Sequence, residues 1–183
     1  MTASADEGFS WNVAGLLGED PGASREYDVA GVELPLDDAL ALAEPIAGRV
    51  RLRRTNRGIL VDADLAATLE AACSRCLRPA LIPVDIHIEE EFLPALDLAT
   101  GKPLPSDAEP EVARLTDHHE VELAPLVRDE LLLAEPIAVL CRPDCPGLCP
   151  ECGLALDDGV HDHPSDEIDP RLEALRGFTP REE

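Results

Sequence analysis

Aromatic and basic residues are scarce in this sequence of 183 residues. Aromatic residues make up 3% of the chain, which leaves few rings on which nucleobases could stack. Lysine and arginine total 15 against 38 acidic residues, for a formal net charge of −23. Because phosphate contacts require clustered cations, this balance argues against a surface that binds nucleic acid over its whole extent. It fits a basic partner or simply a very soluble acidic protein.

Long apolar runs are also absent. A transmembrane helix needs about 18 consecutive apolar residues, and no stretch of the sequence approaches that, so we expect no membrane association. The opening stretch MTASADEGFSW has neither the basic nor the apolar region of a secretory signal. We therefore expect a bacterial protein of the cytoplasm. Structural disulfides are rare in that compartment, so clustered cysteines more often bind metal.

A strand pattern fills the middle of the sequence. Apolar and polar residues alternate over residues 46–54, 59–73 and 82–92, and the turn sequence NRG separates the first two runs. The second run has eight in-phase apolar positions and ends at Cys73. These runs predict an antiparallel β-meander with one solvated face.

One strong helical pattern follows the strands. The sequence ELAPLVRDELLLAEP places Leu123, Val127 and Leu131 on one side, and Pro136 ends the pattern. Its apolar side needs a cover, and the dry face of the meander is the obvious one. The sequence PIAVL (136–140) then reads as a short buried strand. A second, short helix is expected at 169–177, where Asp-Pro begins it and glycine stops it.

Six cysteines provide the chemistry of the chain. Two CxxC pairs, CSRC and CPEC, flank Cys141 and Cys145. A redox CxxC follows a strand and opens a helix, but CSRC leads into another strand, and the glycine after CPEC breaks helices. Zinc deaminases need a His-x-Glu or Cys-x-Glu element, which is missing here. Structural zinc is therefore the favoured interpretation, although tetrahedral sulfur also suits iron.

The number of possible ligands favours two ions, because the sequence HDH supplies two further ligands after the last cysteine. We predict one site of Cys73, Cys76, Cys141 and Cys145, and a second of Cys149, Cys152, His161 and His163. Two alternatives require one ion. In one, the two CxxC pairs share it and Cys141 and Cys145 stay idle or partial. In the other, the four late cysteines share it. Histidines 118 and 119, in contrast, are expected on a surface loop.

These elements predict an α+β fold: an antiparallel β-meander covered by one main helix, with zinc-knuckle cysteine clusters and a small C-terminal helix. The expected organisation has a lead-in segment (1–45), a core domain of meander and helix (46–148) and a zinc-binding extension (149–183). Residues 94–119 lack periodicity and are rich in proline and aspartate, so we expect a mobile loop there.

Basic residues are concentrated near the meander, where the local charge is about +4. They are a candidate RNA-binding surface. The alternative is a solvated sheet face whose arginines pair with acidic residues across strands, such as Asp62, Asp64 and Glu70. The candidate nucleic-acid-binding residues are Arg49, Arg51, Arg53, Arg54, Arg57, Arg75 and Arg78.

The order of the motifs resembles a known family. CSRCLRP, ELAPLVRDELLLAEPI, CRPDCPGLCPECGLALDDG and EIDPRLEAL occur here in the same order as in the YceD family, described as promoting accumulation of large-subunit ribosomal RNA. The early LLGEDPGASREYDV is also similar. Where this sequence has His161-x-His163, similar members have a Cys-x-Cys or related pair.

The resemblance implies a non-enzymatic role in accumulation of 23S ribosomal RNA and in large-subunit biogenesis. The expected partner is the large-subunit ribosomal RNA precursor or a basic ribosomal protein, and no small-molecule substrate is expected. A zinc-dependent enzyme acting on RNA or nucleotides is the alternative, and it would require an open coordination position in a pocket.

Overall fold

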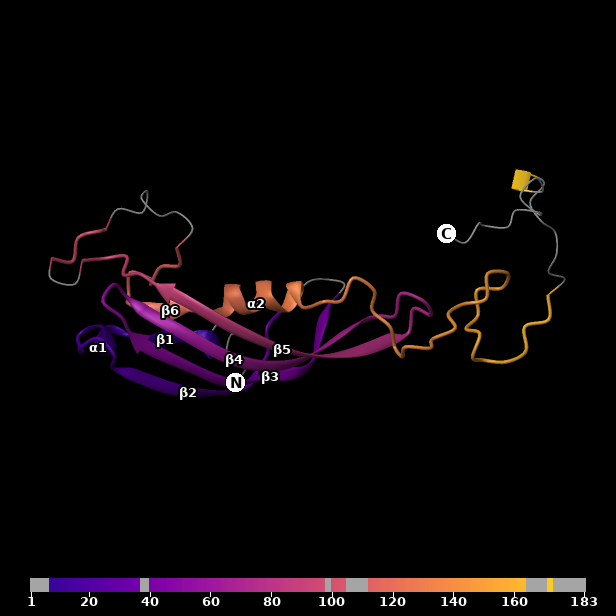
Figure 1. Ribbon diagram of the computed structural model, residues 1–183, viewed down its shortest axis with the longest axis horizontal. Coiled ribbons are helices and arrows are strands. Elements are labelled where there is room, and N and C mark those ends of the chain that lie inside the picture. Colours follow the sequence, from indigo (N-terminus) through magenta and orange to yellow (C-terminus); the bar gives the residue numbers. More distant parts are fainter. Residues whose placement is uncertain (1–6, 37–39, 98–99, 105–111, 164–170, 173–183) are drawn as a thin grey trace, which may run out of the picture. The chain divides into compact units, whose positions relative to one another are not determined.

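A computed structural model describes residues 7–36, 40–97, 100–104, 112–163 and 171–172 of the chain (Figure 1). The chain divides into two compact units, Met1–Cys145 and Pro146–Glu183. The first unit holds the sheets and helices, and the lead-in segment is part of it. The described residues of the second consist of turns, one isolated β-bridge between Leu148 and Ala155, and a 3-10 segment at 171–172.

Four antiparallel strands form the main sheet of the first unit, so the α+β class and the antiparallel meander are confirmed. The strands neighbour one another in chain order, β2-β3-β4-β5 (Figure 1). Three of them correspond to the three predicted runs, and the fourth comes from the lead-in segment. The strands are β2 (Ser24–Val32), β3 (Ala41–Arg54), β4 (Ile59–Ala72) and β5 (Pro79–Phe92).

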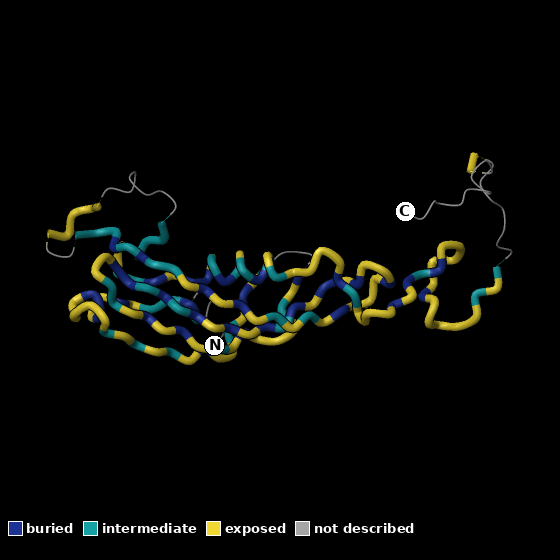
Figure 2. The backbone as a smooth tube through the Cα atoms, in the orientation of Figure 1, coloured by how far each residue is buried: buried dark blue, intermediate teal, exposed yellow. Residues whose placement is uncertain are grey.

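Strand β4 lies between β3 and β5, and its burial alternates along its length. Its residues from Ile59 to Ala71 alternate between a buried face and a face open to water, as Figure 2 shows along the sheet. Val61 and Leu69 are completely buried. The inward residues of β3 and β5 continue this apolar layer, with Val50 and Ile88 among them. Burial of this layer is the main favourable contribution to folding.

Two α-helices occur in the described residues, so the expectation of one main helix is not confirmed in that form. The longer, α2 (Ala124–Leu133), lies where the sequence pattern predicts it, packs beside β5, and buries Val127 and Leu131. The shorter, α1 (Ala14–Leu17), covers part of β3. Neither helix is long and apolar enough to cross a membrane.

A small second sheet fastens the N-terminal segment to the start of α2. Strand β1 (Ser10–Asn12) follows the 3-10 helix η1 (Glu7–Phe9) and pairs antiparallel with β6 (Glu120–Glu122). The backbone N–H of Leu123 donates to the Phe9 carbonyl at 2.9 Å, immediately before α2. The aromatic ring of Phe9 is completely buried, so the pairing also contributes to the core.

The segment after α2 differs from the prediction. Residues 136–140 form bends rather than a strand. Ile137 is fully exposed, and only Val139 is buried. The 94–119 segment holds no helix or strand in its described residues, which are tied by backbone hydrogen bonds such as Leu115 N–H to Leu93 carbonyl at 2.9 Å; its mobility stays a prediction. The helix predicted at 169–177 lies almost entirely outside the described residues.

Replacement of Leu69 by alanine tests the dry face of the sheet. The side chain is completely buried, so Leu69→Ala should lower the free energy of unfolding by about 2–5 kcal/mol. The matched control is Leu81→Ala on β5, whose side chain is 62% exposed and whose loss should cost no more than about 0.5 kcal/mol. Urea denaturation followed by circular dichroism measures both. Equal losses would show that the assigned inner face is wrong.

Candidate metal centres

The structure gathers four cysteines at the end of the main sheet. Cys73 and Cys76 lie on the turn that joins β4 to β5, and Cys141 and Cys145 lie on the segment after α2. All four sulfurs lie within 4.8 Å of one another. Two of the pairs are separated by 72 and 65 residues in sequence, so folding alone brings them together.

The sulfur separations match those around a tetrahedral ion. The Sγ atoms of Cys73 and Cys145 are 3.9 Å apart, and those of Cys76 and Cys141 are 3.7 Å apart. Four sulfurs at the usual zinc–sulfur distance of about 2.3 Å would lie about 3.8 Å from one another. A disulfide would need a sulfur–sulfur distance of about 2 Å, and none of the six cysteines forms a disulfide. The cluster therefore has the dimensions of a metal site and not of a bridge.

One backbone hydrogen bond and one from a side chain hold the two cysteine segments together. The Ser74 N–H donates to the Val139 carbonyl at 2.8 Å, which joins the turn after β4 to the segment after α2. The Arg75 guanidinium donates to the carbonyl of Cys145, also at 2.8 Å. Both contacts connect the two halves of the ligand set directly, so the segment after α2 is positioned without forming a strand.

The thiols of Cys73 and Cys141 have pKa values shifted in opposite directions. Backbone hydrogen bonds from Cys141, Cys76 and Arg75 lower the pKa of Cys73 to about 6, which favours its thiolate form. Loss of hydration around the sulfur, with hydrogen bonds to neighbouring thiols, raises the pKa of Cys141 to about 12. A group of thiols this close cannot carry four negative charges without a cation, and a divalent ion would supply the missing charge.

A second set of ligands gathers in the other unit. It consists of Cys149, Cys152, His161 and His163, whose ligand atoms also lie within 4.8 Å of one another. The Sγ of Cys152 is 3.4 Å from Nδ1 of His161. A sulfur and a nitrogen on one tetrahedral zinc ion would be about 3.5 Å apart. This set is more exposed than the first, since only Cys149 is buried, whereas three residues of the first set are buried.

The two imidazoles are arranged as ligands. The Nε2–H of His161 donates to the Ala155 carbonyl at 3.1 Å, and Nδ1 is directed toward Cys152. This is the outer contact that metal-binding histidines ordinarily make. Nε2 of His163 is buried and has no hydrogen-bond partner in the described part of the chain. A buried polar atom without a partner is costly, and coordination of a metal would satisfy it.

The two CxxC turns share one backbone conformation, which the sequence signals in only one of them. The residue after the second cysteine is left-handed in both, with φ of 61° at Leu77 and 70° at Gly153. Each donates its N–H to the carbonyl of the first cysteine at 2.9 Å. Glycine signals this conformation in CPECG, whereas leucine conceals it in CSRCL because a left-handed leucine is disfavoured. The Leu77 side chain is largely exposed in this turn.

The donor sets suit structural zinc. Four thiolates, or two thiolates with two imidazoles, are the usual tetrahedral ligands of zinc, and they fill every coordination position. Cys149 supports this role further, because backbone hydrogen bonds from Cys152 and Glu151 lower its pKa. The grouping is the one expected from local blocks of sequence. That these sets bind metal, and that the metal is zinc, stays a prediction.

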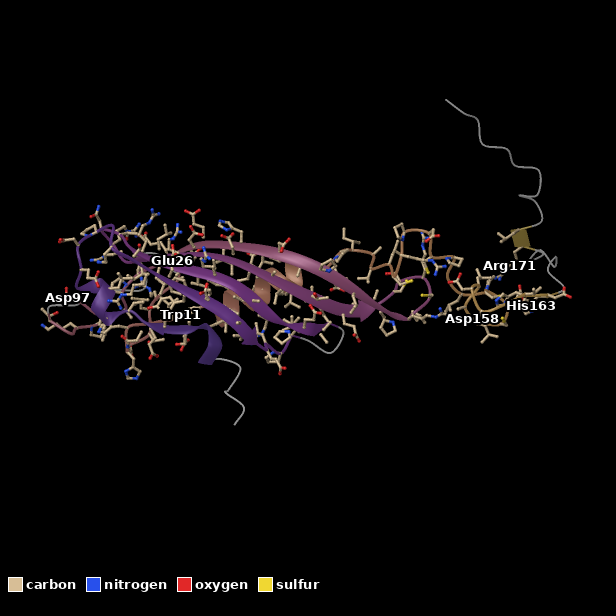
Figure 3. All side chains as sticks on the ribbon, turned by 90° about the horizontal axis from the view of Figure 1, so that it is seen from below. Trp11, Glu26, Asp97, Asp158, His163 and Arg171 are labelled. Atoms are coloured by element: carbon tan, nitrogen blue, oxygen red, sulfur yellow. The ribbon has the colours of Figure 1, made fainter. Side chains whose placement is uncertain are left out.

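Three of the seven candidate RNA-binding arginines, Arg49, Arg51 and Arg53, lie on the open face of the sheet, where acidic residues accompany them. Arg51 contacts Glu26 on β2 at 2.6 Å, and Arg49 lies 3.7 Å from Asp28 (Figure 3 labels Glu26). On the other side, Arg51 stands opposite Asp62 on β4. Opposite charges thus alternate across the strands, which stabilises the sheet modestly and leaves less free positive charge for phosphate.

The remaining candidate arginines are spread over several places, and some have structural contacts. Arg54 donates to the carbonyls of Leu17 and Gly58, and so fixes the turn between β3 and β4. Arg57 lies 3.9 Å from Glu91, and Arg75 holds Cys145 as described above. Arg53 continues the open face of β3, opposite Ser24 on β2, and Arg78 lies immediately after the CSRC turn. Their role in binding RNA is untested and stays a prediction.

One further group of potential ligands lies on the open face. His87 on β5 contacts Asp64 through Nδ1 at 2.9 Å, and Asp62 is nearby. The hydrogen bond from His87 to Asp64 raises the pKa of His87. These side chains are mostly exposed, and cross-strand ion pairs of this type are common without metal. We regard them as part of the alternating charges of the sheet.

Comparison with known proteins identifies the family. The family described as "Large ribosomal RNA subunit accumulation protein YceD" matches residues 61–179, which include all eight candidate ligands. The chain belongs to this family. The match extends from β4 through both cysteine clusters, so the resemblance seen in the sequence motifs is confirmed.

Other members of the YceD family are similar over most of the chain. An uncharacterized protein of Mycobacterium bovis is 36% identical over 167 residues, which cover 87% of this chain and 76% of that protein. An uncharacterized protein of Mycobacterium tuberculosis matches with the same values. The uncharacterized protein YlbN of Bacillus subtilis is 23% identical over 87% of this chain and 90% of its own length. No solved structure matches the chain significantly.

Metal analysis of purified full-length protein tests the two sites. We expect two zinc ions per chain by inductively coupled plasma mass spectrometry, because each set supplies all four ligands of a tetrahedral ion. The double variants Cys73→Ser/Cys76→Ser and Cys149→Ser/Cys152→Ser should each retain one ion. The control His118→Ala changes a histidine outside both sets and should retain two.

Two results would contradict the two-site prediction. One zinc ion per wild-type chain would favour a shared site, as would loss of all zinc in both double variants when circular dichroism shows a folded sheet. Iron in place of zinc would retain the sites but change the ion.

Proposed function

We propose that this member of the YceD family is a non-enzymatic factor that promotes accumulation of 23S ribosomal RNA and biogenesis of the large ribosomal subunit. The observation that supports this role is the family match over residues 61–179, whose description refers to large-subunit ribosomal RNA accumulation. In this proposal the two cysteine clusters are structural zinc sites that hold the chain in its binding conformation.

The composition of both clusters supports a structural role for the metal. Catalytic zinc keeps a coordination position for water or substrate, whereas each set here supplies four protein ligands. A groove of about 650 Å³ is lined by residues between Glu33 and Pro45, none of them cysteine or histidine. A smaller groove of about 280 Å³ reaches the CSRC turn at Leu77, but no candidate ligand lines it. A zinc enzyme acting on RNA or nucleotides would need both an open position and a pocket beside it.

The zinc ions would connect parts of the chain that have few other contacts. In the first unit, the ion would join the β4–β5 turn to the exit of α2, and the thiolates would remain unavailable for redox chemistry. In the second unit, only Gly147, Cys149 and Ala155 are buried among the described residues. Such a segment cannot form an apolar core, so metal binding would supply most of its folding free energy.

Charge limits how the protein would take part in ribosome assembly. A net charge of −23 opposes extensive contact with RNA, and acidic residues accompany Arg49 and Arg51 on the open face. Two modes remain: a local contact between the arginine-bearing face and the ribosomal RNA precursor, or binding of a basic ribosomal protein by the acidic surface. Both would promote accumulation of the large-subunit RNA by protecting an intermediate from misassembly.

Affinity purification of the full-length protein from its own cells tests the proposed function. A tagged protein should enrich 23S ribosomal RNA precursors or large-subunit proteins over 16S RNA and small-subunit proteins, as measured by RNA sequencing and mass spectrometry. A tag alone is the control. Enrichment of neither large-subunit RNA nor its proteins would contradict the proposal.

The contribution of the arginines is measured in the same experiment. Changing Arg49, Arg51 and Arg53 to glutamate should reduce recovery of 23S RNA if the open face contacts phosphate. A matched control replaces the same residues by lysine, which keeps the charge. Unchanged recovery with glutamate would exclude the RNA-contact mode and leave the protein-contact mode.

A further inference from the structure

One stretch of the main sheet has a partner on one side only. Strand β3 pairs with β4 from Ala41 onward, whereas β2 joins β3 only from Ile46, which stands opposite Val32. Within the described residues, Ala41–Pro45 is therefore a sheet edge. Main-chain groups on such an edge are available to a further strand.

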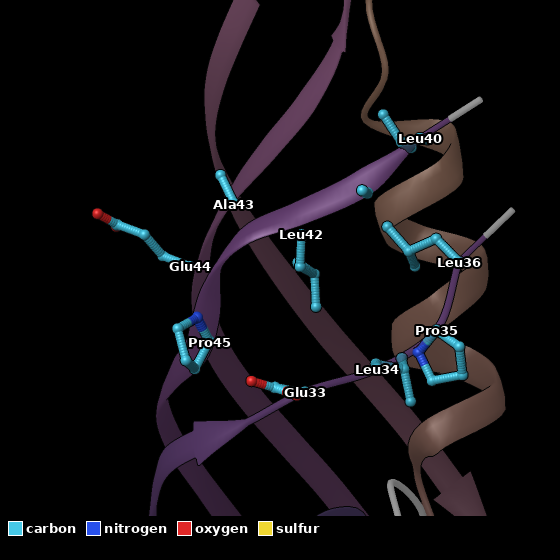
Figure 4. Close-up of a pocket in the computed structure, with 10 residues that line it drawn as sticks. Glu33, Leu34, Pro35, Leu36, Leu40, Leu42, Ala43, Glu44 and Pro45 are labelled. Carbon is cyan, nitrogen blue, oxygen red and sulfur yellow. The ribbon is translucent and has the colours of Figure 1, made fainter. Parts of the chain in front are cut away.

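The edge borders an apolar groove. After β2, the chain leaves the sheet and runs along α2, where Arg128 donates to the Pro35 carbonyl at 3.0 Å. A groove of about 650 Å³ opens between this segment and β3 (Figure 4). Leu42 points into the opening, and Leu34 and Leu40, which are buried, line it as well.

The rim of the groove is acidic. Glu33 and Glu44 line it on opposite arms, and both are exposed (Figure 4). Glu44 also accepts a hydrogen bond from the Thr68 hydroxyl at 3.2 Å. The described residues of the two arms, 33–36 and 40–45, contain no lysine or arginine. An apolar floor between carboxylates attracts a chain that alternates apolar and basic side chains, and repels a phosphate backbone.

We propose that the groove between Leu34–Leu36 and β3 binds an extended basic segment of another protein, which adds as a strand to Ala41–Glu44. The segment's main-chain groups would pair with this edge, its apolar side chains would contact Leu42 and Leu36, and its lysine or arginine side chains would face Glu33 and Glu44. The proposal rests on the function proposed above and names the partner of that function as a basic protein segment and not RNA.

The structure favours a partner from outside over closure by the chain itself. The Glu33–Leu36 segment is the natural continuation of β2, yet the hydrogen bond from Arg128 holds it beside α2 and away from β3. Proline at position 45 cannot donate a hydrogen bond, so it limits the available edge to about four residues, or roughly 13 Å of strand. An added strand this short would bind weakly by itself, so the apolar and charged contacts must provide specificity.

The probe is a fluorescein-labelled peptide of alternating lysine and valine, titrated into the full-length, metal-loaded protein and followed by fluorescence anisotropy. Backbone amide signals of Ala41 and Ala43 should shift in nitrogen-15 NMR spectra as the peptide is added. A peptide of alternating glutamate and valine should not bind. The lysine–valine peptide with N-methylated central residues should bind at least about tenfold more weakly, because its backbone cannot donate hydrogen bonds to the edge of β3.

Variants locate the binding to the groove. Glu33→Lys/Glu44→Lys should weaken binding about tenfold or more, and Leu42→Asp should also weaken it. The control Asp117→Lys/Glu122→Lys makes the same change in net charge on exposed residues of the β6 region and should bind like wild type. Equal weakening by both double variants would show that the peptide responds only to overall charge, and would overturn the proposal.

Two further outcomes separate this proposal from the general function. The groove proposal would be overturned if the lysine–valine peptide did not bind, or if labelled oligouridine bound and Leu42→Asp abolished that binding. The proposed function would still stand if large-subunit RNA co-purified with the protein. Peptide binding at the groove without any enrichment of large-subunit components would support the groove and refute the function.

Discussion

The convergence of four sulfurs at one end of the sheet is the constraint on which the arrangement of the first unit depends. The chain beyond α2 has no strand to join it to the sheet, and Ile137 within it is fully exposed. What positions it is the hydrogen bond from Ser74 to Val139 and the cluster that places Cys73 beside Cys145. A metal ion there would fasten the exit of α2 to the longest strand pairing of the fold. The helix would then be held at both ends, because β6 and β1 fix its start.

Charge and apolar surface are arranged separately around this frame. The open face of the sheet alternates arginine and carboxylate across β2, β3 and β4, as in the contact between Arg51 and Glu26. Such a surface is polar but nearly balanced, and contributes solubility more than strong attraction. The excess negative charge lies elsewhere, including both arms of the groove at Glu33 and Glu44. In the proposal made above, a basic protein segment would bind at this acidic groove, while the arginines of the open face remain engaged within the sheet.

Sequence predicted the parts of the fold that depend on periodicity, and missed those that depend on long-range pairing. Alternation over residues 59–73 specified β4 and the buried position of Cys73, because a strand with one dry face must alternate. The full nine-residue length of β2 and the early start of β3 at Ala41 were not predicted, since strand segments at a sheet edge with mixed exposure have weak patterns. PIAVL is apolar, yet it forms no strand, and a backbone hydrogen bond from Ser74 to Val139 joins it to the turn after β4. Ligand spacing grouped the eight candidate residues, but only the structure revealed that Leu77 repeats the left-handed turn of Gly153.

X-ray absorption at the zinc edge of the purified full-length protein tests the closed structural sites most directly. One site of four sulfurs and one of two sulfurs and two nitrogens average to about three sulfurs and one nitrogen for each zinc, with sulfur at about 2.3 Å and no oxygen ligand. We expect that spectrum, unchanged when ribonucleotides are added. A shell with an oxygen ligand that ribonucleotides displace would contradict it, since it would reveal the open position of a catalytic ion.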